Sequence, residues 1–349
     1  MSFSDFRSSL WMNRRRLLAG SIGLAAIPLM PRLIRPSVGL AQADQEITVA
    51  LDWYPNANHA GLFLGEVRGY FANEGLRLNA YTPSDPTTVL QTVGAGKDTF
   101  GISYQTDVLL ARAQGVPVVS VAALVQHPLL AVMTLRNAAI TRPADLVGKT
   151  VGYPGIPSQE AFLATMLEAD GASLADITLI NVSFNLVPTL IAGQADAVMG
   201  AYWTHETILA EREGYPVDIL RVEDWGVPDY YELVLVASEE TVAERGEMVS
   251  AFLRALQRGY GDASSDQPAA LNALTAAYEA IDREVETEGL RLLTPVWTDG
   301  VSAFGEQSPT RWLDYAAWMT SRELIPADLD PSAAFTTALL PVPPGTPVA

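Results

Sequence analysis

The chain reads EITVALDWYPNANHAGLFLGEVRGYFANEGLRLNA from Glu46 to Ala80. An apolar, β-branched run at 47–51 leads into a turn rich in Pro and Asn, and an amphipathic stretch at 60–70 precedes a second short run at 76–80. Short apolar runs that alternate with amphipathic stretches indicate strands and helices in βαβ units. The sequence therefore predicts an α/β fold built on a mostly parallel sheet.

The alternation continues to Gln114 and resumes after Pro143, which indicates a second α/β unit. Two apolar runs without turn residues, Leu129–Leu135 and Tyr231–Ala237, flank this unit, and we expect the chain to cross between two lobes there. The predicted organisation is a first lobe from residues 44–135 and 231–340, an inserted second lobe from residues 136–230, and a frayed tail at 341–349.

The first 43 residues are typical of an export signal. Arg14–Arg16 precede the apolar run Leu17–Met30, and small residues follow at Ala41 and Ala43, in a pattern that resembles a twin-arginine signal. A transmembrane anchor is the alternative, but glycines and a proline interrupt the run, and it is shorter than the ~20 apolar residues that a span needs. We therefore expect residues 1–43 to be cleaved and the mature protein to be periplasmic.

Composition excludes several classes of function. The chain has no cysteine, so disulfides, thiolate metal sites and a cysteine nucleophile are excluded. Without residues 1–43 it carries 16 basic and 39 acidic side chains, a net charge of −23. Such an acidic surface repels nucleic acid and anionic lipid. We expect a solvated extracytoplasmic monomer with no nucleic-acid partner.

Ligands of open α/β sheets bind beyond the carboxyl ends of the strands, so the residues that follow each predicted strand are the first candidates for a site. Four segments meet this criterion, at 52–61, 103–107, 153–160 and 201–206, and a fifth, at 224–232, leads into the second predicted crossover strand. The candidate ligand-binding residues in them are Asp52, Trp53, Asn58, His59, Tyr104, Tyr153, Ser158, Tyr202, Trp203, Glu206 and Tyr231.

Some of these side chains also have a purely structural interpretation. Asn58 and Ser158 are both suited to cap a helix. His59 could be an ordinary hydrogen-bonded histidine in a turn, and the aromatics of 224–232 could form a hinge and lid or pack between the lobes. Glu206 favours a site more strongly, since a carboxylate that follows two aromatic residues at a strand end would be costly to bury unpaired.

The absence of Lys and Arg from the candidate segments narrows the chemical class of the ligand. No Lys or Arg occurs in 52–66, 98–111, 152–168, 196–211 or 224–238. Receptors for nitrate, sulfonate or phosphate ordinarily present a cation or many N–H donors to the anion, so these ligands are disfavoured. Aromatic faces together with carboxylate and amide groups suit a flat ring that carries amino groups.

Signals for catalysis are weak. The three histidines, His59, His127 and His205, are too scattered in sequence to predict a metal site. None of the patterns HExxH, GxSxG and CxxC occurs. We therefore expect a binding protein that needs neither a metal nor a cofactor, and not an enzyme.

Two motifs carry a family resemblance. Leu51–Gly61, LDWYPNANHAG, and Gly200–Glu206, GAYWTHE, together resemble the family that binds pyrimidine precursors of thiamine, whose bacterial members are formylaminopyrimidine-binding proteins of ABC importers. The resemblance implies a type II periplasmic-binding-protein fold with a hinged cleft and an ABC permease as membrane partner. It also implies a small heterocyclic ligand. Riboflavin or another aromatic heterocycle is the alternative, since relatives for such ligands share the scaffold.

The same family contains fungal hydroxymethylpyrimidine phosphate synthase, an enzyme that consumes one of its own histidines. The resemblance aligns His59 with that histidine. The fungal enzyme also carries a cluster of cysteines, which this chain lacks, and the predicted export signal would separate the chain from cytosolic pyridoxal phosphate. A synthase is therefore the less favoured alternative.

Overall fold

The computed structural model describes residues 45–341, and these belong to one compact unit. The predicted signal segment at 1–43 and all but the first residue of the predicted tail at 341–349 lie outside the described part of the chain. Within it, no helix is long and apolar enough to cross a membrane.

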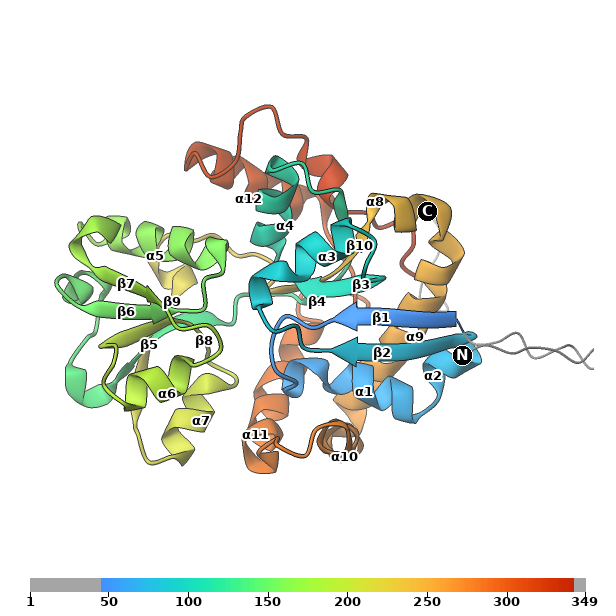
Figure 1. The fold of residues 1–349 in the computed structure, drawn as a ribbon, viewed down its shortest axis with the longest axis horizontal. Coiled ribbons are helices and arrows are strands. Elements are labelled where there is room, and N and C mark those ends of the chain that lie inside the picture. Colours follow the sequence, from blue (N-terminus) through green and yellow to red (C-terminus); the bar gives the residue numbers. More distant parts are fainter. Residues whose placement is uncertain (1–44, 342–349) are drawn as a thin grey trace, which may run out of the picture. The chain divides into compact units, whose positions relative to one another are not determined.

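Sheet I begins with the stretch quoted above. Its strands are β1 (Gln45–Ala50), β2 (Leu76–Tyr81), β3 (Phe100–Ser103), β4 (Val118–Val125) and β10 (Leu233–Ser238), in the order β2-β1-β3-β10-β4 (Figure 1). β1 pairs in parallel with β2 and β3, whereas β10 is antiparallel to both of its neighbours. β4 and β10 are buried along their whole length, which explains why they read as continuous apolar runs.

Sheet II has the same number of strands. They are β5 (Leu130–Leu135), β6 (Thr150–Tyr153), β7 (Thr178–Asn181), β8 (Ala197–Tyr202) and β9 (Val217–Arg221), in the order β7-β6-β8-β5-β9. β6 is parallel to β7 and β8, and β5 is antiparallel to β8 and β9. Lobe I denotes sheet I with its helices, and lobe II denotes sheet II with its helices.

Helices complete both lobes. Those of lobe I are α1 (Ala60–Val67), α2 (Tyr70–Asn73), α3 (Val89–Gly94), α4 (Gln105–Ala113), α8 (Glu239–Glu244), α9 (Gly246–Ser265), α10 (Gln267–Ala277), α11 (Arg283–Leu293) and α12 (Pro309–Ser321). Those of lobe II are α5 (Pro157–Ala169), α6 (Leu186–Ile191) and α7 (Glu206–Arg212). Short 3₁₀ turns include η1 (Ala57–His59) and η6 (Val222–Trp225).

The first boundary between the lobes differs from the sequence prediction. Leu129–Leu135 was expected to be a crossover at the end of lobe I, but β5 pairs with β8 and β9 and so belongs to sheet II. The chain therefore passes between the sheets at residues 126–129, after β4, and returns through residues 226–232, before β10. The partners of β5, the strands β8 and β9, lie far along the chain, so no local pattern of residues shows that β5 belongs to sheet II.

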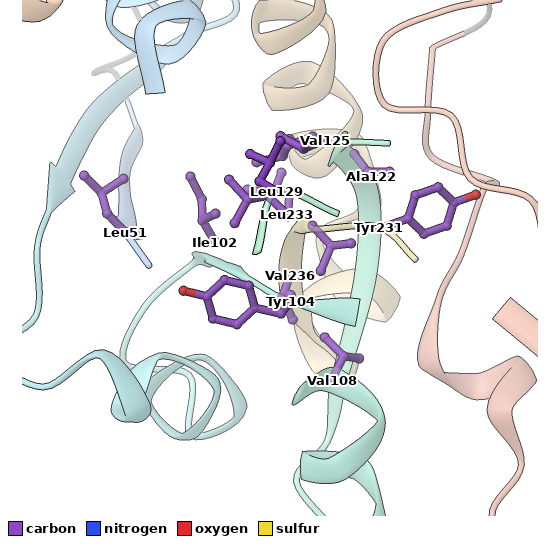
Figure 2. Packing of buried hydrophobic residues seen from close by; sticks show 14 of the residues in the cluster. Leu51, Ile102, Tyr104, Val108, Ala122, Val125, Leu129, Tyr231, Leu233 and Val236 are labelled. Atoms are coloured by element: carbon purple, nitrogen blue, oxygen red, sulfur yellow. The ribbon is translucent and has the colours of Figure 1, made fainter. Parts of the chain in front are cut away.

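The core of lobe I reaches the strand ends that face lobe II. Figure 2 shows buried side chains of this core, including Leu51 directly after β1, Ile102 of β3 and Leu233 of β10, with Tyr104 near Ile102. α1 packs closely on α9, where a Cβ at Gly259 would overlap the carbonyl oxygen of Gly61. This contact fixes the helix that follows the loop after β1, and with it the position of that loop.

Candidate functional site

A central pocket of about 260 Å³ lies where strand ends of the two sheets meet. Its lining residues are Asp52, Trp53, Tyr104, Gln159, Gly200, Tyr202 and Glu206. The first three follow β1 and β3 of lobe I, and the others come from α5, from β8 and from the start of α7 in lobe II. Five of the predicted residues are brought together here: Asp52, Trp53, Tyr104, Tyr202 and Glu206.

Two hydrogen bonds, from His59 and Tyr104, hold the carboxylate of Asp52 in place. Its Oδ1 accepts a hydrogen bond from Nε2 of His59 at 3.0 Å, and its Oδ2 accepts one from the Tyr104 hydroxyl at 3.3 Å. Nδ1 of His59 accepts from the backbone N–H of Asn56, which places the ring proton on Nε2. His59 is fully buried and does not line the pocket, so the structure gives it a supporting role in the turn.

Asn58 also belongs to the turn. Oδ1 of Asn56 accepts from both the backbone N–H and the side-chain amide of Asn58, each at 2.9 Å. The Tyr260 hydroxyl of α9 donates to the carbonyl oxygen of Asn58 at 2.6 Å. Asn58 does not line the central pocket. Its contacts instead fix the path of the loop that carries Asp52 and Trp53.

Glu206 is a buried carboxylate beside a buried histidine. Its Oε2 accepts from the backbone N–H of Tyr202 at 2.8 Å. Burial raises the pKa of Glu206, against the opposing charge of His205. Burial by itself would lower the pKa of His205, but the charges of Glu206 and Glu286 outweigh it and raise that pKa to about 9. His205 is therefore a cation at neutral pH, next to the pocket.

Glu286 of α11 connects the two lobes and was not predicted. Its Oε1 lies 3.2 Å from Nδ1 of His205, an ion pair whose N–H is not aligned for a hydrogen bond, and its Oε2 accepts from the backbone N–H of Ala57 at 2.6 Å. Phe184 of lobe II makes a second connection, since its ring centre lies 4.6 Å from those of Trp53 and Tyr54. The contacts of Glu286 and those of Phe184 both join the loop after β1 to lobe II.

Gln159 is, with Gly200, one of two pocket residues that sequence reasoning missed. Its side chain is buried, and Oε1 has no hydrogen-bond partner in the described part of the chain. Gly200 opposite has φ +108°, and a Cβ there would lie 2.5 Å from this oxygen. The segment 153–160 contains two of the predicted residues, Tyr153 and Ser158, but Gln159 is not among them. Ser158 instead donates from Oγ to Oδ2 of Asp107 at 2.5 Å.

Three further predicted residues do not line the pocket. Trp203 donates from Nε1 to the carbonyl oxygen of Pro128 at 3.3 Å, and its ring packs under the guanidinium of Arg221. The Tyr231 hydroxyl accepts from the backbone N–H of Ser308 at 2.7 Å, and Tyr231 lies outside the lining of the central pocket. Tyr153 is half-buried at the end of β6.

Trp203 and Tyr231 both lie just outside a strand, Trp203 in the turn after β8 and Tyr231 two residues before β10. Contacts distant in the chain hold both side chains, from Trp203 to Pro128 and from Tyr231 to Ser308. No local pattern of residues in the sequence shows such contacts.

The pocket presents acceptors to a ligand. Asp52, Glu206 and the free Oε1 of Gln159 supply oxygen atoms, and Trp53, Tyr104 and Tyr202 supply aromatic surface. None of the lining residues is Lys or Arg. In the described residues, no group of three His, Asp or Glu side chains is placed to hold a metal ion. The arrangement therefore suits a flat ligand that donates hydrogen bonds.

Two mixed α/β sheets with a pocket between their strand ends define the type II periplasmic-binding-protein fold. The fold is similar to that of the alkanesulfonate-binding protein from Xanthomonas axonopodis pv. citri, with a TM-score of 0.68, 17% sequence identity and coverage of 84% of this chain and 98% of that one.

The chain belongs to the NMT1/THI5-like family, whose model matches residues 56–270. It is 39% identical to the formylaminopyrimidine-binding protein of Halalkalibacterium halodurans over 300 residues. This alignment covers 85% of this chain and 91% of the relative. It is 25% identical to the 4-amino-5-hydroxymethyl-2-methylpyrimidine phosphate synthase of Schizosaccharomyces pombe, over 83% of this chain and 85% of the relative. The predicted family and fold class are thereby confirmed.

Proposed function

We propose that this protein is the extracytoplasmic solute-binding protein of an ABC importer and that it binds a small neutral aminopyrimidine related to thiamine. The ligand enters between the two lobes, the crossovers flex, and the closed form docks on a membrane permease. The name of the relative from Halalkalibacterium halodurans supports this ligand class.

The observation that carries the proposal is a buried pocket that offers hydrogen-bond acceptors and has no Lys or Arg in its lining. Ring amino groups are donors, and carboxylate oxygens of Asp52 and Glu206 would accept from them. Gln159 adds an acceptor that has no hydrogen-bond partner among residues 45–341, a costly state unless a ligand satisfies it. A sulfonate would place its oxygens against these acceptors, so the fold neighbour's ligand class is disfavoured here.

The central pocket is lined by seven residues, and this small lining suits a single ring. A second hollow of about 480 Å³, lined among others by Leu90, Tyr104, Asp107 and Ile156, adjoins at Tyr104. Riboflavin or another multi-ring heterocycle would require both spaces, and this is the alternative ligand class.

We propose binding rather than catalysis. The fungal relative is named as a synthase, and His59 is the residue that the family resemblance aligned with its consumed histidine. In this chain both ring nitrogens of His59 are engaged, by Asp52 and by the Asn56 N–H, and its side chain is fully buried behind the pocket. These contacts support a structural role for His59.

Calorimetry on the mature protein tests the proposal. We expect a formylaminopyrimidine or another aminopyrimidine to bind, and riboflavin and an alkanesulfonate to bind more weakly. Tighter binding of riboflavin would favour the alternative, and turnover of pyridoxal phosphate would favour the enzyme. N-terminal sequencing of protein released from the periplasm tests the location, because we expect it to begin near Asp44.

A further inference from the structure

Glu232 is a buried carboxylate at the junction of the two crossovers. Its side chain is 1% exposed, and it lies directly before β10. Oε2 accepts hydrogen bonds from the backbone N–H groups of Leu129 and Leu130, at 2.7 and 3.2 Å, and from the Tyr230 hydroxyl at 2.9 Å. Oε1 accepts from the Tyr202 hydroxyl at 3.1 Å. One carboxylate thus holds both crossovers and the end of β8.

The end of β8 has two further bonds to the first crossover. The backbone N–H of Trp203 donates to the carbonyl oxygen of Leu129 at 3.1 Å, and its indole N–H donates to that of Pro128. These bonds explain why Trp203 points away from the pocket. They also make the loop after β8 and the first crossover one hydrogen-bonded unit.

Tyr202 is the member of this unit that lines the central pocket. Its ring faces the pocket and its hydroxyl is bonded to Glu232, which does not itself line the pocket. A ligand that packs on Tyr202 therefore touches a group bonded directly to the carboxylate that holds both crossovers. Burial raises the pKa of Glu232 to about 7, although the four hydrogen-bond donors lower it. Each donor therefore helps to keep this carboxylate charged.

We propose that Glu232 is a positioning residue that couples the ligand pocket to the hinge between the lobes. It orients the ring of Tyr202 for the ligand and holds the crossovers in the arrangement that goes with it. Ligand affinity then depends on Glu232 without any contact between the two. This inference deepens the proposed function and rests on it for the identity of the ligand.

Three variants of the mature protein separate coupling from plain stability. Glu232→Gln keeps the shape and removes the charge, Tyr202→Phe removes the bond on the pocket side, and Tyr230→Phe removes a bond of similar length on the side away from the pocket. Calorimetry with an aminopyrimidine gives the affinity, and thermal unfolding gives the stability.

We expect Glu232→Gln and Tyr202→Phe each to bind about ten-fold more weakly, the loss of one hydrogen bond to a charged group. The double variant should bind no more than about three-fold more weakly than the weaker single variant, because both changes break one connection. Tyr230→Phe should lower the melting temperature and leave affinity within about two-fold. If Glu232→Gln melts lower but binds like wild type, Glu232 is only structural and the proposal is wrong.

A second measurement does not require the ligand. Hydrogen exchange on the ligand-free protein reports the amides of Leu129 and Leu130, whose hydrogen bonds end on Glu232. We expect Tyr202→Phe to speed their exchange, since the pocket-side bond supports the same carboxylate. Unchanged exchange in Tyr202→Phe would refute the coupling. Failure of wild type to bind any aminopyrimidine would instead refute the proposed ligand and leave this test to decide the coupling.

Discussion

Asp52 and His59 form a buried pair in the loop after β1, with Nε2 of His59 donating to Oδ1 of Asp52 at 3.0 Å. The histidine fixes the orientation of a carboxylate that lines the central pocket. Because His59 acts through Asp52, its removal should affect ligand binding without removing any contact to the ligand.

We therefore predict that His59→Ala binds an aminopyrimidine about ten-fold more weakly and loses roughly 1–3 kcal/mol of stability, because it leaves Asp52 buried and short of a donor. His59→Gln offers a side-chain N–H to Asp52 and should recover part of both losses. Calorimetry and thermal unfolding check these outcomes. Equal affinity of His59→Ala and wild type would show that the orientation of Asp52 is unimportant for the ligand.

Glu206 should contribute directly to affinity. Glu206→Gln keeps an oxygen for the Tyr202 N–H and removes the charge, so a ring amino group loses roughly 1.5–3 kcal/mol and binding weakens about ten- to a hundred-fold. Its melting temperature without ligand should stay near that of wild type, because burial disfavours the charge. Glu211→Gln, on the exposed side of α7, is the matched control. Wild-type affinity of Glu206→Gln would remove Glu206 from the site.

Trp53 and Trp203 should behave differently. Trp53 lines the pocket, so Trp53→Ala should lose roughly 0.5–1.5 kcal/mol of aromatic interaction with a ring ligand. Trp203→Phe keeps a ring beside Arg221 and should bind within a few-fold of wild type. Fluorescence distinguishes them, since the change on ligand addition should persist in Trp203→Phe and shrink in Trp53→Phe. The reverse pattern would restore Trp203 as a cleft residue.

Stability should fall as pH rises from about 5 to 9. Burial raises the pKa of Asp107 to about 6 and that of Glu232 to about 7, while nearby carboxylates raise that of His205 to about 9. The folded state therefore binds more protons than the unfolded chain between the unfolded and folded pKa values, and this stabilisation is lost as pH rises through the folded values.

Thermal unfolding at pH 5, 7 and 9 measures this trend. His205→Gln should make the melting temperature change less between pH 7 and 9, because the pKa of His205 is the highest of the three. Asp107→Asn should make the melting temperature change less between pH 5 and 7. A wild-type midpoint that rises steadily toward pH 9 would show that these groups do not control the stability.

Local sequence predicted the parts of the site that depend on strand ends. Asp52 and Tyr104 follow the parallel strands β1 and β3 of sheet I, whose carboxyl ends meet at one edge, and Glu206 follows β8 of sheet II. Glu232 and Glu286 were missed because their partners lie far along the chain, 103 residues in the case of Leu129 and 229 in the case of Ala57. Such contacts come from the packing of the two lobes, which no local pattern encodes.

The positive φ of Gly200 allows a test of Gln159. Gly200→Ala meets two penalties, a positive φ of +108° and a Cβ 2.5 Å from Oε1 of Gln159. Gly193→Ala is the matched control, since its φ of +66° is also positive but nothing lies within 4 Å of the added carbon.

Both variants should melt at lower temperature, because a positive φ at a residue other than glycine costs roughly 1–3 kcal/mol. Gly200→Ala alone should also lose affinity for an aminopyrimidine, by about ten-fold, because the added carbon pushes the free acceptor of Gln159 out of place. Gln159→Ala should lose a similar amount, and the double variant should lose little more, since both changes remove one contact. If Gly200→Ala and Gly193→Ala bind the ligand equally well, Gln159 makes no hydrogen bond to it, and the ligand is held by Asp52 and Glu206 without the amide.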